Sequence, residues 1–161
     1  MRAVVLTIST TLAAGEGDAA SGPLLARHAT EAGCAVTAVE VLPDDRAAIA
    51  ARLRELVAAD VRFVFTTGGT GLTTDDVTPE ATRDVLEREA PAFQQAMLIE
   101  GLRHQPLALL SRGVSGIAGR TLIGNFPGSP KAIDQVFGVI APALRHAAAT
   151  LEREGSRGGH D

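Results

Sequence analysis

The sequence predicts an α/β domain, an α/β sandwich with a mostly parallel sheet. Two observations support this prediction: short apolar runs alternate along the chain with segments of helical periodicity, and 45% of the residues are hydrophobic. The length of 161 residues suits a single domain with its own core. We expect residues 1–152 to form this domain and residues 153–161, a polar segment rich in glycine, to form a flexible tail.

Five apolar segments have the length and composition of buried strands. They are residues 4–8, 35–41, 61–65, 107–110 and 121–123. The first is followed by residues 9–21, a stretch rich in alanine and glycine that predicts a loop. Ligands of such sheets bind beyond the carboxyl ends of the strands, so the loops that follow these strands are the candidates for a functional site.

Helical segments separate the strands, and capping residues mark their starts. Ser21 opens the first helix and Gly33 ends it, Asp45 precedes the second, and Thr78 opens the third. Within these segments apolar residues recur at helical spacing. Pro142 predicts a kink or a break in the last helix. Two of the predicted helices cover residues 92–102 and 130–152.

Charge and composition exclude several classes of protein. The net charge of −4 argues against nucleic acid as the main partner, because binding to a phosphate backbone requires a basic face. The single cysteine, Cys34, excludes a disulfide framework and a cysteine-rich zinc site, and we expect it to be buried. The chain opens without a signal-like segment, and no apolar run approaches the roughly 18 residues of a membrane span. We therefore expect a cytoplasmic protein that binds neither nucleic acid nor membranes.

The most informative stretch is residues 66–81, which has the order strand end, glycine-rich loop, two aspartates and helix. No Gly-Lys-Ser or Gly-Lys-Thr ends the loop, and the third glycine of the dinucleotide fingerprint is missing. An ordinary strand-to-helix turn is the alternative to a ligand-binding loop. The small residues favour the ligand-binding loop, because they let a ligand approach backbone N–H groups that bind phosphate oxygens.

Two pairs of aspartates precede predicted helices, Asp44 with Asp45 and Asp75 with Asp76. Capping of the following helix explains one member of each pair, and the other member can face a cleft. Carboxylates from separate loops that meet at the sheet edge suit Mg²⁺, which takes few protein ligands together with phosphate oxygens and water. The residues alone do not decide which aspartate of the first pair faces the metal.

Residues 124–132, with the sequence GNFPGSPKA, combine a turn with a helix start. Ser129 can cap a helix whose first residue is Pro130, and the start of a helix attracts anions. Lys131 is unfavourable for the helix dipole at this end. Its place there favours contact with a ligand phosphate over a solvated surface lysine.

Ser111 and Arg112 follow the predicted strand at residues 107–110. Ser111 can hydrogen-bond to a polar heterocycle, whereas Arg112 can meet an anion or a carboxylate, or lie at the surface or at a subunit interface. The four histidines show no metal-ligand spacing. Without a Gly-x-Ser-x-Gly motif or an evident catalytic histidine, a serine hydrolase is excluded.

These motifs, taken in order, resemble the signature of the molybdenum cofactor biosynthesis family, which includes the MogA and MoaB proteins, molybdopterin adenylyltransferase and the gephyrin G domain. The sequences TTGGTG at residues 66–71 and DVTPEA at residues 76–81 carry the resemblance, which extends from about residue 4 to residue 143. Further family blocks match in the same order at residues 21–23, 43–45, 110–112 and 125–132.

The resemblance implies a three-layer fold, usually trimeric, and a reaction. The family moves AMP from Mg·ATP onto the terminal phosphate of molybdopterin, releases pyrophosphate, and passes the product to a separate metal-insertion protein. Asp44 and Asp76 then become the catalytic and metal-binding residues. The implied substrate contacts are Thr67, Gly68, Gly69, Thr70, Gly71, Ser111, Asn125, Pro127, Gly128, Ser129 and Lys131.

One loop departs from the family pattern, which often begins Ser-Asp and contains a basic residue. Here Ser9 is followed by Thr10, and residues 9–15 contain no basic residue. This departure favours one alternative, a carrier or assembly scaffold that binds molybdopterin without adenylyl transfer. A second alternative is a regulatory domain of similar architecture that binds a nucleotide and no pterin. The sequence does not choose between molybdenum and tungsten as the eventual metal.

Overall fold

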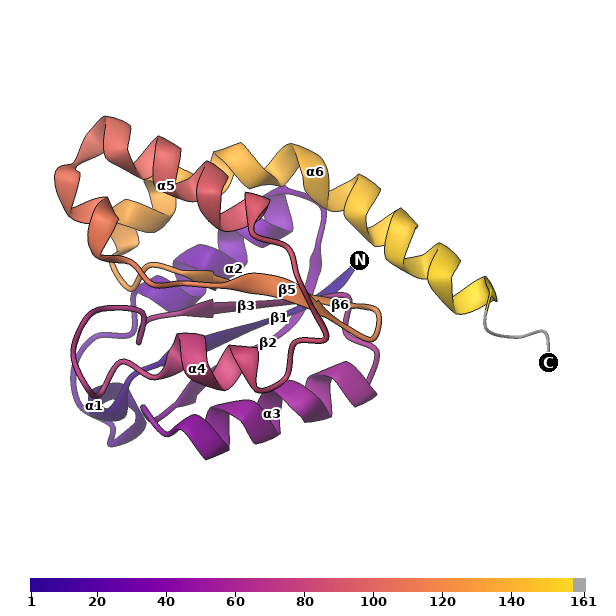
Figure 1. Cartoon of the computed structure of the whole chain (residues 1–161). Helices are drawn as coiled ribbons and strands as arrows, with labels where there is room; N and C mark the ends of the chain where they lie inside the picture. Colours follow the sequence, from indigo (N-terminus) through magenta and orange to yellow (C-terminus); the bar gives the residue numbers. More distant parts are fainter. Residues whose placement is uncertain (158–161) are drawn as a thin grey trace.

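A six-stranded sheet forms the middle layer of the protein in the computed structural model, which describes residues 1–157 (Figure 1). The strand order is β2-β1-β3-β6-β5-β4. Strands β2, β1, β3 and β6 run parallel, whereas β5 is antiparallel to both of its neighbours. The strands are β1 (Arg2–Ile8), β2 (Ala35–Leu42), β3 (Phe63–Thr67), β4 (Arg88–Glu89), β5 (Ser115–Ala118) and β6 (Thr121–Phe126).

Helices cover both faces of the sheet, and this arrangement confirms the predicted α/β class with a mostly parallel sheet. Helices α2, α5 and α6 lie on one face, and α3 and α4 on the other (Figure 1). The helical elements are α1 (Thr10–Ala13), α2 (Ser21–Glu31), α3 (Arg46–Ala58), α4 (Thr78–Arg83), α5 (Ala92–His104), the 3₁₀ helix η1 (Pro106–Leu110) and α6 (Pro130–Arg157).

Two apolar clusters fill the spaces between the layers. Because side chains alternate along a strand, β1 contributes Ala3 and Val5 to the cluster under α2 and α6, and Val4, Leu6 and Ile8 to the cluster over α3. Buried aromatic rings join the first cluster, with centroids 5.4 to 6.1 Å apart between contacting pairs. These rings belong to Phe63, Phe65, Phe126 and Phe137.

The strand predicted at residues 107–110 is wrong. This segment forms the 3₁₀ helix η1, and Leu107, Leu109 and Leu110 are exposed. Pro106 at its start donates no backbone hydrogen bond, and the sheet neighbour of β6 is instead β5, which the sequence prediction missed. This apolar run therefore lies at the protein surface and does not form a buried strand.

The ends of several elements also differ from the prediction. Residues 10–13 form α1 within the expected loop, and Ser9 Oγ caps it by accepting a hydrogen bond from Leu12 N. Helix α6 continues through Pro142 to Arg157, so residues 153–157 are helical where the sequence predicts a tail. The rest of that predicted tail, residues 158–161, lies outside the described residues.

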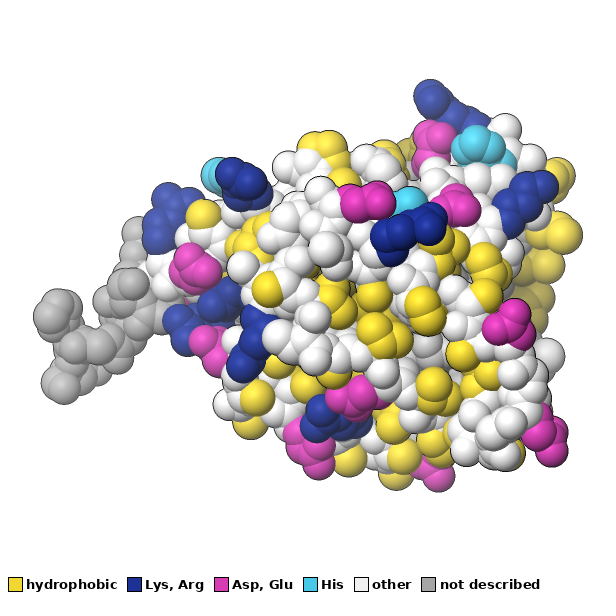
Figure 2. Space-filling view, turned by 180° about the vertical axis from the view of Figure 1, so that it is seen from behind, with side chains coloured by type: hydrophobic (Ala, Val, Ile, Leu, Met, Phe, Trp, Pro, Cys, Tyr) yellow, Lys and Arg dark blue, Asp and Glu magenta, His cyan; other side chains and the backbone are white. Residues whose placement is uncertain are grey.

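β2 is the edge strand of the sheet on the side opposite β4. Val39 and Val41 on this strand are 45% and 38% exposed. Figure 2, seen from behind, shows hydrophobic side chains across the middle of this face and charged side chains above and below them. In the part of the chain that the structure describes, no helix is long and apolar enough to cross a membrane.

Candidate functional site

The loops that follow β3 and β6 meet at the carboxyl edge of the sheet. β3 lies beside β6 with Thr67 opposite Phe126, so both strands end at the same level of the sheet. Thr67 Oγ1 donates a 2.8 Å hydrogen bond to Pro127 O, and this bond ties the two loops together. The loops also touch through glycines, because a Cβ on Gly128 would lie 3.3 Å from Gly68 Cα.

The glycine loop, residues 68–71, binds the rest of the protein through its carbonyl oxygens. Gly68 O and Gly69 O accept hydrogen bonds from Thr78 Oγ1 and Thr78 N at 3.0 and 3.1 Å. Thr70 O and Gly71 O accept hydrogen bonds from Arg112 N and Arg112 Nε at 2.9 and 2.7 Å. Within residues 1–157, the N–H groups of residues 69–71 donate to no protein acceptor. The loop therefore keeps backbone donors for a ligand, as a phosphate-binding nest does.

Two glycines of this loop cannot be replaced without strain. Gly68 and Gly69 have φ angles of +92° and +66°, a conformation that side chains rarely adopt. A Cβ on Gly68 would lie 2.4 Å from Ile8 O, and one on Gly69 would lie 2.3 Å from Thr78 Oγ1. The glycines thus allow the loop to approach β1 and α4 as closely as it does.

The structure separates the members of the two aspartate pairs. Asp45 caps α3 by accepting a 2.9 Å hydrogen bond from Ala48 N, whereas Asp44 Oδ1 would lie 3.1 Å from a Cβ on Gly69. Asp75 is exposed, whereas Asp76 Oδ2 would lie 2.8 Å from a Cβ on Gly71. Asp44 and Asp76 therefore lie against two glycines of the same loop.

Threonines hold both of these carboxylates. Asp44 Oδ2 accepts hydrogen bonds from Thr10 N and Thr10 Oγ1, both at 3.0 Å. Asp76 Oδ2 accepts hydrogen bonds from Thr73 N at 3.0 Å and from Thr73 Oγ1 at 2.8 Å. Over the described residues, the Oδ1 atom of each aspartate accepts none and stays available to a ligand.

Thr10 is a site residue that sequence reasoning missed. It occupies the position after Ser9 where the family often has aspartate, and a hydroxyl at that position gave no signal of its own. The structure explains the residue, because Thr10 Oγ1 also accepts a 3.0 Å hydrogen bond from Asp44 N. Thr10 therefore orients the aspartate through both its backbone and its side chain.

Arg112 stabilises the glycine loop and lines neither of the two cavities described below. Its guanidinium donates to Gly71 O, to Asp76 O at 2.7 Å and to the Glu80 carboxylate at 2.5 Å. The hydrogen bond from Arg112 lowers the pKa of the Glu80 carboxyl below its ordinary value. Of the roles open to Arg112, the structure selects the contact with a carboxylate, and that contact holds the loop ends together.

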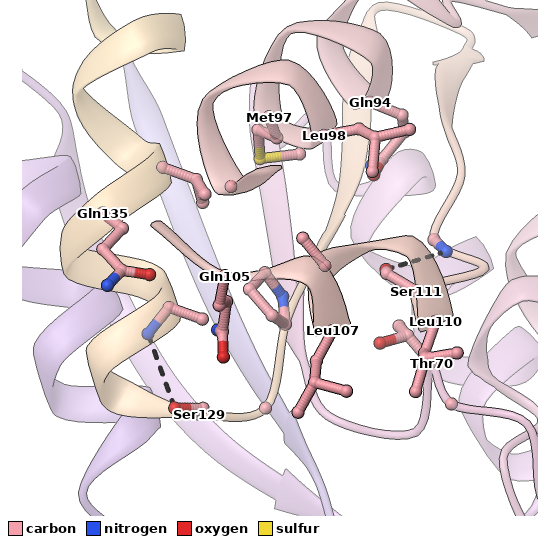
Figure 3. A pocket seen from close by; sticks show the side chains of 18 of the residues that line it. Thr70, Gln94, Met97, Leu98, Gln105, Leu107, Leu110, Ser111, Ser129 and Gln135 are labelled. Atoms are coloured by element: carbon pink, nitrogen blue, oxygen red, sulfur yellow. Dashed lines mark hydrogen bonds between the residues drawn. The ribbon is translucent and has the colours of Figure 1, made fainter. Parts of the chain in front are cut away.

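A cavity of about 500 Å³ opens between this loop, α5, η1 and the start of α6 (Figure 3). Asp76, Ser111 and Ser129 line it together with the glycine loop, and most of the remaining wall is apolar. A second cavity of about 360 Å³ adjoins it at Gly68 and Gly128, and Ser9, Thr11, Ser21 and Thr67 contribute to its wall.

The structure does not bring every predicted site residue to these cavities. Asn125 is 1% exposed, and its side chain bonds to Val114 N and to the hydroxyl groups of Thr66 and Thr82. Lys131 is exposed and lines neither cavity. Asp44 also lines neither, although it lies against Gly69.

At the start of α6, the N–H groups of Ser129 and Lys131 donate to no protein acceptor within residues 1–157, whereas the next two are used. Ser129 Oγ and Ser129 O accept hydrogen bonds from Ala132 N and Ile133 N. Ser129 caps the helix, as the sequence predicts, and in doing so uses two N–H groups of its first turn.

The carboxylates suit a magnesium ion that arrives with a nucleotide better than a resident metal. Among the described residues, no group of three or more His, Cys, Asp or Glu side chains is placed to hold a metal. Asp44 and Asp76 each present one unused oxygen beside the glycine loop, and Mg²⁺ completes such a partial shell with phosphate oxygens and water. The fit therefore depends on a phosphate ligand.

The sequence of residues 4–146 matches the family described as a probable molybdopterin binding domain. The chain belongs to the MogA/MoaB family of molybdenum cofactor biosynthesis. A solved structure similar to it is the molybdopterin biosynthesis enzyme MoaB from Thermus thermophilus, which is 38% identical with a TM-score of 0.87. That similarity covers 93% of this chain and 95% of the Thermus chain. The resemblance inferred from the motifs is confirmed.

Relatives of this family differ in length and in name. The chain is 41% identical over 145 residues to the molybdenum cofactor synthesis protein cinnamon of Drosophila melanogaster, covering 89% of this chain and 24% of that protein. It is 45% identical over 98 residues to a molybdopterin adenylyltransferase of Haemophilus influenzae, covering 60% of this chain and 50% of that protein. The chain thus spans half or less of the length of these two relatives.

Proposed function

We propose that the protein is a molybdopterin adenylyltransferase, which transfers AMP from Mg·ATP to the terminal phosphate of molybdopterin and releases pyrophosphate. The hydrogen-bonding state of the glycine loop carries this proposal. Its carbonyl groups are bound to Thr78 and Arg112, its N–H groups at residues 69–71 are free within residues 1–157, and Asp44 and Asp76 lie against two of its glycines. A loop in this state binds phosphate oxygens and a cation at the same time.

In the proposed reaction, a phosphate oxygen of molybdopterin attacks the α-phosphorus of ATP. A new phosphorus–oxygen bond forms while the bond between the α-phosphorus and the bridging oxygen breaks, and pyrophosphate leaves with that electron pair. The reaction needs no covalent intermediate on the protein. Because both reactants are anions, the protein must hold them in line and offset their repulsion.

The protein offsets this repulsion with backbone donors rather than with basic side chains. Among the described residues, no lysine, arginine or histidine lines either cavity. The N–H groups of residues 69–71 would donate to the phosphate oxygens, while Thr10 and Thr73 orient the two aspartates. Bound Mg²⁺ supplies the positive charge that stabilises the triphosphate and the leaving pyrophosphate. Asp44 Oδ1 and Asp76 Oδ1 would hold it.

The adjoining cavities support a reaction between two substrates. They share Gly68 and Gly128, so groups bound in the two cavities meet at the glycine loop. The contact between these glycines is close enough that a Cβ on Gly128 would lie 3.3 Å from Gly68 Cα. An arrangement of this kind can hold one reactant on each side of the reacting phosphates.

The experiment that tests the proposal measures AMP incorporation and pyrophosphate release from Mg·ATP, with and without molybdopterin. We expect pyrophosphate release to require molybdopterin and to equal the amount of AMP incorporated. Removal of magnesium by EDTA should stop both. A protein that binds molybdopterin but releases no pyrophosphate is the carrier of the alternative proposal, and one that binds ATP without a pterin is a regulatory domain.

The departure at Ser9 and Thr10 favours the carrier alternative in sequence, but the contacts of Thr10 favour catalysis. A carrier has no need to orient Asp44 with both a backbone N–H and a hydroxyl group.

We also propose that the protein forms a homotrimer, acts in the cytoplasm and passes its product to a molybdenum-insertion protein. Sedimentation of the purified protein tests the trimer.

A further inference from the structure

All four glutamines of the sequence line the larger cavity. They come from distant parts of the chain: Gln94 and Gln95 lie on α5, Gln105 ends that helix, and Gln135 lies on α6. A carboxamide offers both a donor and an acceptor without a charge, and it therefore suits the edge of a neutral heterocycle. This concentration of glutamine goes beyond the residues that the family motifs supplied.

Gln94 has a structural task. Its Nε2 donates hydrogen bonds to Val114 O, Ser115 Oγ and Asn125 O at 3.0, 2.6 and 2.9 Å. These contacts fix α5 above the ends of β5 and β6, and they leave the other glutamines to face a ligand.

Gln135 differs from Gln94 in its hydrogen bonding. Its Oε1 is buried, and within the described part of the chain it has no hydrogen-bond partner. A buried acceptor without a partner is costly, and such a group in a native structure calls for an explanation. Gln135 lines the cavity, and the terminal amide torsion of glutamine is soft, so its oxygen can turn toward a ligand N–H bound there.

Gln105 completes the arrangement. In Figure 3, the amide of Gln135 on α6 faces the space beside Gln105 at the end of α5, and the Gln105 side chain extends toward Ser129. The Gln105 side chain makes no hydrogen bond among residues 1–157, so its amide nitrogen and its amide oxygen both remain available. The two side chains therefore offer donors and acceptors from opposite sides of the cavity.

The rest of the wall suits a flat ring rather than a triphosphate. Apolar side chains surround the glutamines, among them Met97, Leu98, Leu107 and Val136. Asp76 is the single charged side chain in the lining, as far as the described residues go, and it lies at the glycine loop. A neutral heterocycle thus finds apolar faces and amide edges in the same cavity.

We propose that Gln135, assisted by Gln105, recognises the N–H edge of the pterin ring and so determines which heterocycle the enzyme accepts. The inference rests on the proposed function, because the pterin is one of its substrates. Gln135 Oε1 accepts a hydrogen bond from the 2-amino group of the ring. The amide of Gln105 donates to a ring acceptor on the other side. Both are binding residues and take no part in bond breaking.

The test compares two probes that differ at one group: pterin, with a 2-amino group, and lumazine, with an oxygen in its place. Binding of each to the purified full-length protein is measured by calorimetry, without ATP. We expect the wild-type protein to bind pterin roughly tenfold more tightly than lumazine, since lumazine leaves Gln135 Oε1 unpaired. Q135M should reduce this ratio to about one, because it keeps the volume and removes the amide.

Two further variants control the experiment. Q135E keeps acceptor oxygens and should retain the preference for pterin. V139M places the same new side chain on the same helix at a residue that is 42% exposed, and it should leave the ratio unchanged. Equal affinity of the wild-type protein for both probes, failure to bind either, or an unchanged ratio in Q135M would overturn the inference. So would loss of ATP binding in Q135M, because the cavity would then recognise adenine.

Failure of the role proposed for Gln135 can be distinguished from failure of the proposed adenylyltransferase activity. A wild-type protein that prefers pterin but transfers no AMP would retain the role of Gln135 and lose the adenylyltransferase activity. One that transfers AMP but shows no preference between the probes would retain the activity and lose the role of Gln135.

Discussion

The two loops that meet at the carboxyl edge of the sheet have similar hydrogen-bonding states but different charged neighbours. In the glycine loop after β3 the carbonyl groups are bound and the N–H groups of residues 69–71 are free. In the turn after β6, Pro127 O accepts from Thr67, and Ser129 accepts from the first turn of α6. Within residues 1–157, the N–H groups of Gly128 and Ser129 donate to no protein acceptor. The difference lies in the carboxylates, because Asp44 and Asp76 lie against Gly69 and Gly71. Ligand binding therefore depends on the charges that the fold brings beside free N–H groups, and residue type within a loop does not reveal this.

The comparison assigns different tasks to the two loops. The glycine loop, with Asp44 and Asp76 beside it, is the part that meets the reacting phosphates. The turn after β6 forms part of the cavity wall and holds the glycine loop in place through the bond from Thr67 to Pro127 O, and the buried amide of Asn125 supports the strands below. Changes in the first region should alter turnover, and most changes in the second should alter stability.

The largest effect is expected from D76N. This substitution removes the charge but keeps the size of a side chain that faces the glycine loop and the larger cavity. We expect turnover in the AMP-transfer assay to fall about 100- to 1,000-fold, with pterin affinity changed less than about threefold. D75N, at an exposed neighbour, is the matched control and should leave turnover intact. Equal turnover of D76N and the wild-type protein would refute the catalytic role.

N125A should act on stability instead. Asn125 Oδ1 accepts from Val114 N at 3.0 Å, and its Nδ2 donates to two buried hydroxyl groups. Alanine leaves the buried Val114 N–H without its acceptor, so the free energy of unfolding should fall by roughly 3 kcal/mol and Tm by about 6–12 °C. Thermal unfolding measures this loss. An unchanged Tm with weakened pterin binding would instead support the direct substrate contact that the sequence implies.

D45A should separate the two aspartates of the first pair. Asp45 is exposed and caps α3 through Ala48 N, so its loss should cost about 1 kcal/mol of stability and leave turnover at low temperature unchanged. D44N is the counterpart, because it removes the charge beside Gly69 and should lower turnover with little change in Tm. If D45A rather than D44N lost turnover, the assignment of the two residues would have to be exchanged.

Much of the fold could be predicted from the sequence, because the signals were local. Alternating apolar runs and capping residues located β1, β2, β3, α2, α3 and α6 to within a few residues. The prediction failed at residues 107–110, where an apolar run without a sheet neighbour formed η1, and at β5, a short strand that depends on pairing with β6. Pairing between segments is a tertiary property, and composition does not show it.

The site was predictable in its residue types but not in its contacts. Glycines and aspartates at residues 68–76 identified the loop. Thr10 could not be found, because a hydroxyl beside Asp44 becomes significant only when α1 and β2 lie together. The same limit applies to Asn125, which the motif places in the site and the hydrogen bonds place behind it.

A smaller effect should follow from the ion pair that holds the glycine loop. Arg112 lowers the pKa of Glu80, so the pair adds stability above the carboxyl group's unfolded pKa, near 4.5, and that stability is lost as the pH falls toward the folded pKa. The side chains are about a third exposed, so solvent weakens the contribution. We expect E80Q to lower Tm slightly at pH 7, and the difference from the wild-type protein to shrink as the pH falls through the lowered pKa of Glu80. A difference in Tm that is constant from pH 7 to pH 3 would contradict this coupling.

The smallest effect is expected at Lys131, the only lysine of the sequence. Its side chain is exposed and lines neither cavity, so its charge reaches the glycine loop only through solvent. We expect K131Q to raise KM for Mg·ATP less than about threefold in low salt, and the effect to disappear near 0.5 M salt, where screening is strong. K131R keeps the charge and should match the wild-type protein. A loss of tenfold or more that persists in high salt would instead mean that Lys131 reaches the phosphates directly and that the turn after β6 binds substrate as the glycine loop does.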